Sequence, residues 1–282
     1  MSPRERMSRV TRKMPRFRGL GRCIIAVDKW LRNRSTVPAF EVIARINGRC
    51  KLVVDTRIIE QLFAYYYGEW EKDLLSAALA HFRGGAFYDI GGSIGLYAVT
   101  IGDHCRDHGG YVRTVEPLPL NLVRLRRNLE LNGLDERWVR VEERGLSDRA
   151  GTLHLAAVAN GIPGNAKVVA HGGLVARVTT LDELWAERQF EPVGFVKIDT
   201  EGFDVPILGG AVRLLTTCRP NLLVEFNRER MRNLRFDIGP SWRLLVEELG
   251  YRCRAIADSA RWTALEQPGE HENLLFLRPS ER

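Results

Sequence analysis

The 282-residue sequence predicts an α/β fold, with a mainly parallel β-sheet and helices on both of its faces. From residue 84 onward, short apolar runs alternate with segments of helical spacing, and this alternation is typical of parallel sheets. Acidic residues also follow several of these runs at once, as Asp89, Glu116 and Asp199 do. Because ligands bind at the carboxyl ends of the strands in such sheets, these residues are candidates for a site.

The elements can be placed in order along the chain. A hairpin is expected over 39–46 and 50–54, because Asn47-Gly48 between β-rich runs is a strong turn signal. Further strands are expected over 86–90, 111–115, 139–142, 152–158, 195–198, 222–226, 251–256 and 273–277. Helices are expected over 58–67, 71–82, 94–102, 120–131, 205–215 and 242–249. The sequence thus predicts a basic N-terminal extension (1–38), a hairpin with helices (39–83) and a ligand-binding domain (84–282).

The composition indicates a soluble, intracellular protein. Hydrophobic and charged residues make up 45% and 27% of the chain, as in ordinary globular proteins. No apolar run approaches the roughly 18 residues that span a bilayer, and no secretion signal is evident at the start. The five cysteines are scattered without a C-x-x-C pair, which favours reduced thiols over a disulfide framework or a zinc site. We therefore expect a cytoplasmic location.

The net charge of +7 is concentrated at the N-terminus. Residues 1–34 hold eleven Lys and Arg against two acidic residues, and the remainder of the chain sums to −2. The first interpretation is a solvated, partly disordered extension. Alternatively, Cys23–Leu31 forms a short amphipathic helix on a membrane surface, or covers an apolar patch of the main domain. The extension is therefore expected to contact a membrane surface peripherally, if it contacts one at all.

The segment Asp89–Gly95 joins the first strand of the domain to its helix. Its glycines permit a tight turn and a close approach of ligand to backbone, and the helix N-terminus offers free N–H groups. A dinucleotide fingerprint needs glycine at its first, third and sixth positions, and no register starting at Gly91 or Gly92 satisfies it. This argues against a nicotinamide-dependent oxidoreductase. An acidic residue before Gly-x-x-x-Gly suits a cationic amine, such as the methionine moiety of S-adenosylmethionine.

Two further segments carry carboxylates at strand ends. Glu116 ends the next strand, 21 residues beyond Gly95, where it can accept the hydroxyl protons of a ribose. Asp199 and Glu201 follow a later strand, where an acceptor should meet the donor. Asp199 is expected to position or deprotonate an acceptor hydroxyl, and Glu201 to orient it or to bind an ammonium group. The structural alternative is that Glu201 and Asp204 cap the helix that begins near residue 205.

These segments resemble the FkbM family of methyltransferases. The similarity lies in Tyr88–Tyr97, Val115–Asn121, Gly145–Asp148 and Lys197–Asp204, in the right order and spacing, and it covers about residues 60–278. Arg219-Pro220 before Leu223-Val224-Glu225, and Glu272–Phe276 near the end, are also similar. Two positions depart from the family pattern, since Gly92 replaces an alanine and Asp204 replaces a glutamate.

The resemblance implies a class I methyltransferase fold, a Rossmann-like seven-stranded sheet with one antiparallel strand. It implies S-adenosylmethionine as the methyl donor and O-methylation, frequently of sugar hydroxyls in glycolipids, glycans or natural products. By position, the donor site would comprise the residues Asp89, Gly91, Ser93, Gly95, Glu116, Asn121, Gly145, Leu146 and Asp199. The first four would line the methionine end, Glu116 would hold the ribose, and Gly145-Leu146 would lie beside the adenine. A further glutamate would be Glu71 or Glu69.

Several alternatives stay open. His171, within the glycine-rich stretch 161–173, is a second candidate base, and that stretch is a candidate lid. Asp199 and Glu225, with Asn227 nearby, are candidate Mg²⁺ ligands, although a metal is not favoured. A nucleic-acid methyltransferase is disfavoured because the core has no base-handling motif and no aromatic-interleaved basic patch. A non-catalytic donor-binding protein is the remaining alternative to a methyltransferase of small molecules, glycans or glycolipids.

Overall fold

The computed structural model describes residues 2–16, 18–33, 40–157, 166–169, 171–200, 202–257, 261–264 and 271–279. Its contacts divide the chain into two compact units, residues 1–72 and 73–282. Glu201 lies outside the described ranges, as do residues 161–165 and 170 of the predicted lid. The roles predicted for these residues therefore stay predictions.

The first unit contains the predicted hairpin. β1 (Glu41–Ile46) pairs antiparallel with β2 (Cys50–Asp55). Asn47 and Gly48 turn the chain with φ of 49° and 102°, the left-handed region that asparagine and glycine tolerate best. The helix α3 (Ile59–Tyr67) follows and ends at a left-handed glycine, as helices commonly do.

Two helices precede the hairpin, so the prediction of a solvated, partly disordered extension is wrong for the described part of residues 2–33. α1 (Pro3–Thr11) begins with a reciprocal capping box between Ser2 and Glu5. α2 (Leu20–Asn33) contains the predicted amphipathic segment and buries Ile24. The apolar residues of this segment recur at helical spacing and form one face that the helix can bury. The net positive charge of the segment makes this pattern easy to miss. No described helix has the length and apolar character required to cross a bilayer.

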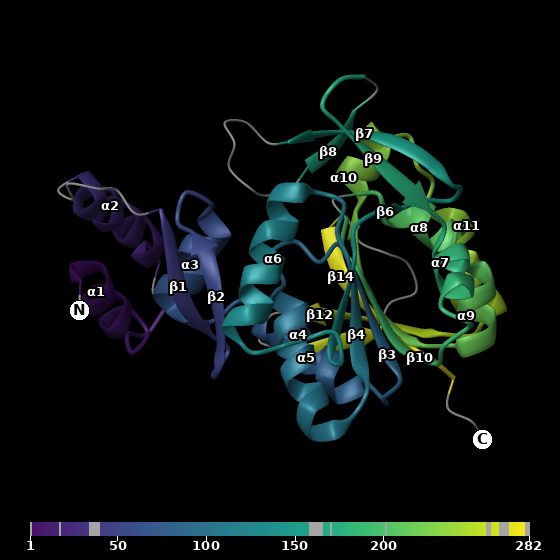
Figure 1. Ribbon diagram of the computed structural model, residues 1–282, viewed down its shortest axis with the longest axis horizontal. Coiled ribbons are helices and arrows are strands. Elements are labelled where there is room, and N and C mark those ends of the chain that lie inside the picture. The colour runs from purple at the N-terminus through teal and green to yellow at the C-terminus, as the bar shows by residue number, and fades with distance from the viewer. Residues whose placement is uncertain are drawn as a thin grey trace. The chain divides into compact units, whose positions relative to one another are not determined.

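The second unit is built on an eight-stranded sheet in the order β13-β12-β14-β11-β10-β3-β4-β5 (Figure 1). The strands are β3 (Ala86–Ile90), β4 (Tyr111–Val115), β5 (Val139–Glu142), β10 (Val193–Ile198), β11 (Asn221–Asn227), β12 (Arg252–Ala257), β13 (Arg261–Ala264) and β14 (His271–Leu277). From β11 to β5 all neighbours pair in parallel, whereas β14 runs antiparallel between β11 and β12. The predicted fold class is thus confirmed, and β13 adds an antiparallel edge strand to the seven that were expected.

Helices cover both faces of this sheet. They are α4 (Lys72–His81), α5 (Leu96–His108), α6 (Pro119–Leu131), α7 (Leu181–Glu187), α8 (Asp204–Gly209), α9 (Val212–Cys218), α10 (Arg228–Asn233), α11 (Gly239–Trp242) and a π-helical turn (Arg243–Glu248). Helices α5 and α6 lie on one side of the strands, and α7, α8 and α9 on the other (Figure 1). Alternate residues of β3 serve the two faces, since Tyr88 joins the core beneath α7–α9 whereas Phe87 stacks on Phe195 at 4.9 Å. The expected helix 205–215 is two short helices separated at Gly210.

A second, smaller sheet was not expected. It has the order β6-β9-β7-β8 and comprises β6 (Gly145–Leu146), β7 (Gly151–Ala157), β8 (Ala166–Val169) and β9 (Leu174–Thr179). β7 corresponds to the strand expected over 152–158, and it pairs antiparallel with both β8 and β9. This sheet is inserted between β5 and α7, and part of the predicted lid is therefore a strand.

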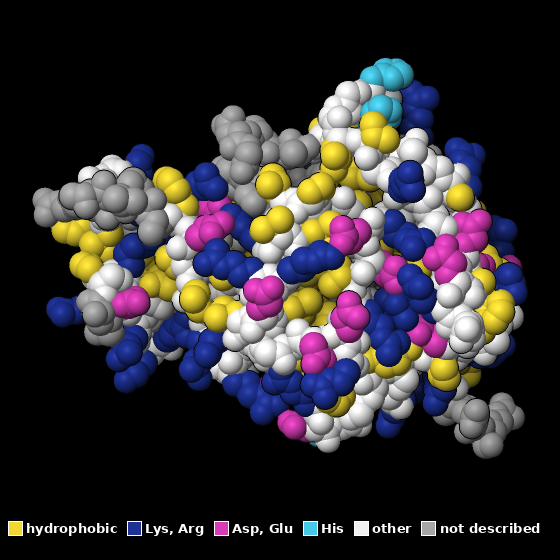
Figure 2. Space-filling model, in the orientation of Figure 1, with side chains coloured by type: hydrophobic (Ala, Val, Ile, Leu, Met, Phe, Trp, Pro, Cys, Tyr) yellow, Lys and Arg dark blue, Asp and Glu magenta, His cyan; other side chains and the backbone are white. Residues whose placement is uncertain are grey.

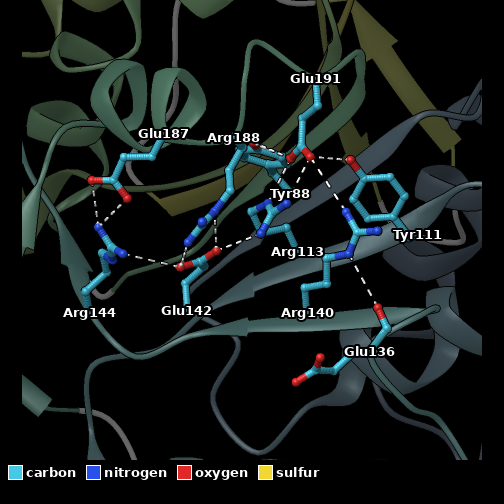
Figure 3. Close-up of polar contacts among 10 residues, drawn as sticks. All are labelled: Tyr88, Tyr111, Arg113, Glu136, Arg140, Glu142, Arg144, Glu187, Arg188 and Glu191. Atoms are coloured by element: carbon cyan, nitrogen blue, oxygen red, sulfur yellow. Dashed lines mark hydrogen bonds and ion pairs between the residues drawn. The ribbon is translucent and has the colours of Figure 1, made fainter.

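A network of arginines and glutamates lies on the β3–β4–β5 part of the main sheet (Figure 3). Arg113 is only 4% exposed and pairs with Glu142 at 2.6 Å and with Glu191 at 2.8 Å. Tyr88 donates a hydrogen bond to Glu191, and Arg188 donates two to Glu142. Burial alone raises the pKa of Glu191, but the hydrogen bonds from Arg113 and the tyrosines hold it below its usual value. Paired charges therefore occupy this part of the sheet, whereas apolar helix faces cover the rest of it.

Candidate functional site

Most of the predicted site residues converge on one pocket at the carboxyl ends of β3, β4 and β10. The pocket has about 740 Å³ of empty space, part of which is open solvent. Seven of the predicted residues line it: Gly91, Ser93, Glu116, Asn121, Gly145, Leu146 and Asp199. Parallel strands bring their carboxyl ends to one edge, which explains why residues more than 100 positions apart meet here.

The glycine loop after β3 is shaped by close backbone contacts. Gly91 has φ of 82°, and a Cβ placed there would lie 2.0 Å from the carbonyl oxygen of Asp199. The N–H groups of Gly91 and Gly92 both donate to the carbonyl of Val115 at 3.0 Å. Glycine is therefore required at position 91, because any side chain would push the loop away from the end of β10.

Asp89 lies beneath this loop and is fully buried. It accepts a hydrogen bond of 3.0 Å from Thr114 and lies 3.6 Å from the ammonium of Lys197. Burial raises the pKa of Asp89, and the neighbouring Lys197 opposes that rise. Asp89 is not among the pocket-lining residues, so its predicted contact with the donor stays a prediction, while its structural contacts are plain.

Lys197 has a place in the site that the sequence did not suggest. Its ammonium donates to the carbonyl of Gly91 at 3.1 Å, and it lies 3.5 Å from the Asp199 carboxylate and 5.0 Å from the ring centre of Tyr97. It thus bridges the glycine loop, Asp89 within β3 and Asp199 directly after β10. One feature of the sequence could have indicated this role of Lys197. Side chains two positions apart along a strand point to the same face, so residues 197 and 199 share a face.

Glu116 is held at the end of β4 by two backbone donors. The N–H of Ser93 donates to one carboxylate oxygen at 2.8 Å, and the N–H of Leu118 donates to the other at 2.9 Å. Burial nevertheless raises its pKa to about 7, so that it titrates near neutrality. A carboxylate has further lone pairs, and Glu116 faces a pocket that can present hydroxyl groups to them.

The pocket combines an unsatisfied acceptor with an apolar wall. The Oδ1 atom of Asn121 is buried and has no hydrogen-bond partner among the described residues, which points to a donor group on a bound ligand. Opposite lie apolar side chains, including Leu146, Leu155 and Val178 of the smaller sheet. No Lys or Arg is among the described residues that line the pocket. A ligand with a flat apolar ring, hydroxyl donors and positive charge fits these surroundings.

Asp199 and Glu225 form a pair at the ends of the neighbouring strands β10 and β11. The Asp199 side chain is 31% exposed, whereas Glu225 is largely buried. Burial first, and then the charge of Asp199 with a hydrogen bond to it, raises the pKa of Glu225 to about 9. Glu225 is therefore protonated at neutral pH and hydrogen-bonds to Asp199.

Asp204 organises the loop that precedes α8. Its carboxylate accepts hydrogen bonds from the N–H and the hydroxyl of Thr200, both at 2.9 Å, and from the N–H of Gly202 at 3.2 Å. Burial raises its pKa to about 6, and the charge of Asp199 contributes to the rise. The prediction that Asp204 caps the following helix is wrong, because α8 begins at Asp204 itself and its N-terminus has no side-chain cap. The Asp204 carboxylate instead fixes the backbone of the loop beside Asp199.

The proposed magnesium ligands are only partly brought together. Asp199 and Glu225 are adjacent, but the side chain of Asn227 accepts a hydrogen bond from the N–H of Arg230 and caps α10. Within the described parts of the chain, no group of three or more His, Cys, Asp or Glu residues could hold a metal ion. A metal therefore stays an alternative that only an experiment can decide.

Three other predicted residues lie away from the pocket lining. His171 is exposed, just ahead of β9. Gly95 begins α5 with φ of 94°, and a Cβ there would lie 2.5 Å from Leu125, so this glycine permits α5 to pack against α6. Glu71, with φ of 46°, precedes α4 in the first unit. The roles predicted for these residues stay predictions.

Comparisons with known proteins agree with the site. The Methyltransferase FkbM domain matches residues 89–253, which is more than half of the chain. One similar solved structure is a methyltransferase FkbM from Methylobacillus flagellatus KT, with 19% identity, a TM-score of 0.44 and coverage of 68% of this chain. This chain spans only 43% of that protein's length. No curated protein matches the sequence.

Two other solved structures are similar at the same low level. They are a putative O-methyltransferase from Klebsiella pneumoniae (14% identity, TM-score 0.40, covering 73% of this chain and 79% of that one) and TYW2 from P. horikoshii in complex with MeSAdo (11% identity, TM-score 0.41, covering 84% and 70%). The domain match, which covers more than half of the chain, shows its family. The chain belongs to the FkbM family of S-adenosylmethionine-dependent methyltransferases.

Proposed function

We propose that this protein is an O-methyltransferase that transfers the methyl group of S-adenosylmethionine to a sugar hydroxyl of a glycan, a glycolipid or a natural product. The observation that carries the proposal is the position of Asp199. Its carboxylate lines the pocket and is partly exposed, and it contacts Lys197 and Glu225. A charged carboxylate with access to solvent is what an acceptor hydroxyl requires as a proton acceptor.

The donor fits the pocket by its chemistry. S-adenosylmethionine carries two positive charges, on its sulfonium and its ammonium groups, and the pocket offers carboxylates without a lining cation. Glu116 and the unsatisfied oxygen of Asn121 are the groups suited to the ribose hydroxyls. The apolar side chains of Leu146 and Val178 are suited to the adenine ring. The predicted assignments of these residues are therefore kept as part of the proposal.

The donor supplies an activated methyl group, so the protein mainly positions the acceptor oxygen and accepts its proton. Alignment of two reactants in one site lowers a barrier by about 7–11 kcal/mol in favourable cases. Asp199 would take the hydroxyl proton as the oxygen–methyl bond forms and the methyl–sulfur bond of the donor breaks, with S-adenosylhomocysteine as the leaving group. Lys197 and protonated Glu225 contact this carboxylate and restrict its position at the pocket.

Asp199→Asn tests the assignment, because asparagine keeps the shape and cannot accept a proton. The variant should lose at least 100-fold in kcat, whereas its affinity for S-adenosylhomocysteine should change less than about threefold. Asp135→Asn is the matched control, since Asp135 pairs with Arg137 on the surface, and it should keep full activity. Full turnover by Asp199→Asn would remove this residue from the mechanism.

The acceptor class is tested by transfer of labelled methyl groups to fractionated glycans, lipids and small metabolites from cells that lack the protein. Labelling of a carbohydrate-containing fraction is expected, at a position that resists mild alkali as an ether does. Label found in bulk RNA or DNA would instead establish a nucleic-acid methyltransferase. Donor binding without label in any fraction would establish a non-catalytic protein. Activity that survives a strong chelator would dismiss the Mg²⁺ alternative.

A further inference from the structure

The charge of the protein is divided unequally between its two units. Residues 1–72 carry sixteen Lys and Arg against seven Asp and Glu, a net charge of +9, whereas residues 73–282 sum to −2. The first unit also exposes large apolar side chains. Of the thirteen that are exposed in the described chain, five lie in residues 2–33: Val10, Met14, Ile25, Val27 and Trp30. In Figure 2, yellow and dark blue side chains adjoin one another over the region of α1 and α2.

The rotation of α2 about its own axis is fixed by Asp28. This carboxylate is fully buried and accepts hydrogen bonds from Arg4 of α1 at 2.9 Å and from the Tyr66 hydroxyl of α3 at 2.6 Å. Arg32, one turn further along α2, pairs with it at 2.8 Å. Because these partners lie on three different segments, α2 cannot turn to hide its outer face without breaking a buried ion pair.

The outer face of α2 is apolar along one edge and cationic along the next. Successive residues are about 100° apart, so Trp30, two positions beyond Asp28, points to the opposite side of the helix. Trp30 is 50% exposed, and Val27, one turn before it, is 40% exposed. Arg22 and Lys29 are also exposed, and their spacing of seven residues places them on the neighbouring edge, two turns apart. On such a face, apolar side chains and ammonium or guanidinium groups lie at the same depth relative to a surface that the helix contacts.

We propose that the first unit binds the surface of a membrane rich in anionic lipids, with α2 lying in the plane of the interface. Val27 and Trp30 would enter the boundary between headgroups and acyl chains, where tryptophan is favoured. Arg22 and Lys29 would meet the phosphates, and the net charge of +9 would attract the unit to the anionic surface. This binding does not depend on the proposed acceptor.

A lipid surface fits this face better than the other partners of a basic helix. A nucleic acid would use the cations but would leave Val27 and Trp30 in water. A second copy would bring two units of +9 together, and like charges oppose such an interface. A bilayer accepts apolar side chains without a matching cavity and supplies the negative charge, so it satisfies both features of the face.

The test is co-sedimentation of the full-length protein with vesicles of 30% phosphatidylserine and 70% phosphatidylcholine, against vesicles of phosphatidylcholine alone. Binding to the anionic vesicles is expected at 150 mM salt, at least tenfold tighter than to the neutral ones, and it should weaken at 500 mM salt. Val27→Asp should weaken it at least tenfold, and Arg22→Glu with Lys29→Glu should do the same. Val212→Asp on α9 is the matched control, because Val212 is 42% exposed, and it should bind like the unchanged protein.

Each contrary outcome overturns the proposal. No binding to anionic vesicles refutes it directly, and equal binding by Val27→Asp shows that α2 is not the contact. A homopolymeric RNA bound in place of the vesicles would identify a nucleic-acid surface. A dimer in solution that dissociates on Val27→Asp would identify a second copy as the occupant of the face. Circular dichroism and thermal unfolding confirm that the surface variants stay folded.

Discussion

Donor binding should depend on pH through Glu116. The carboxylate is enclosed at the end of β4, and burial raises its pKa to about 7 although two backbone N–H groups donate to it. Only the charged form keeps all of its lone pairs available to accept hydrogen bonds from ribose hydroxyls. Deprotonation therefore precedes or accompanies donor binding, and affinity should rise as the pH rises through 7.

The size of the effect follows from the population of the charged form. With a pKa of about 7, roughly nine tenths of Glu116 is charged at pH 8 and roughly one tenth at pH 6. Because apparent affinity is reduced by the fraction of competent protein, the dissociation constant should be about tenfold higher at pH 6 than at pH 8. At pH 5 the factor should approach about 100.

Isothermal titration with S-adenosylhomocysteine measures this directly, because that ligand binds without turnover. Glu116→Gln should weaken binding about 100-fold at pH 8, since it removes a charged acceptor and turns an amide N–H toward a backbone N–H. It should also abolish the pH dependence. Glu143→Gln, on the exposed surface, is the control and should behave like the unchanged protein. A dissociation constant that stays flat between pH 6 and 8 would refute this reasoning.

Three further variants test the structure around the site, each by chemical or thermal unfolding. Gly91→Ala should cost more than about 3 kcal/mol of unfolding free energy, because a backbone clash adds to the strain of positive φ. Gly109→Ala, with φ of 81° and open space around it, should cost about 1 kcal/mol. Equal losses would contradict the clash. Arg113→Met should cost about 3–5 kcal/mol, because it removes the buried guanidinium that pairs with both Glu142 and Glu191, whereas the exposed Arg137→Met should have no measurable effect. The pKa of Glu225 is raised from 4.5 to about 9, so stability that is present below pH 4.5 is lost as the pH rises toward 9. Glu225→Gln should therefore be more stable than the unchanged protein at pH 8, by at least about 2 kcal/mol, and equal stability at pH 8 would show that this carboxyl is not buried as a neutral acid.

The sequence predicted the main sheet well because its signals are local. The apolar runs in β3 and β10 belong to central strands of a sheet that helices cover on both faces, and such strands are almost continuously hydrophobic. The strand ends then identified most of the pocket. Gly91, Glu116 and Asp199 each directly follow a strand, so their meeting needed no knowledge of packing.

The remainder depends on contacts between distant residues. In the sequence alone, Arg113 looks like an exposed charge within an apolar strand. Its partners Glu142 and Glu191 lie 29 and 78 positions away, and only the fold brings them to it. Lys197 likewise has no evident role until β3 lies beside β10 and places Asp89 within reach of its ammonium. The smaller sheet was missed for a similar reason, because β6 has two residues and gains its partner only from β9.

The two walls of the pocket differ in how far the fold determines them. The donor wall is formed by strand ends and the backbone of the glycine loop, which the parallel sheet fixes through hydrogen bonds and through steric limits such as that at Gly91. The opposite wall comes from the inserted sheet, and its side chains, including Leu153, Leu155 and Val168, are apolar. Apolar contacts have no preferred direction, so this wall restricts the identity of a ligand less than the hydrogen-bonding groups at the strand ends do. This difference is one reason why the sequence points to the methyl donor more sharply than to an acceptor.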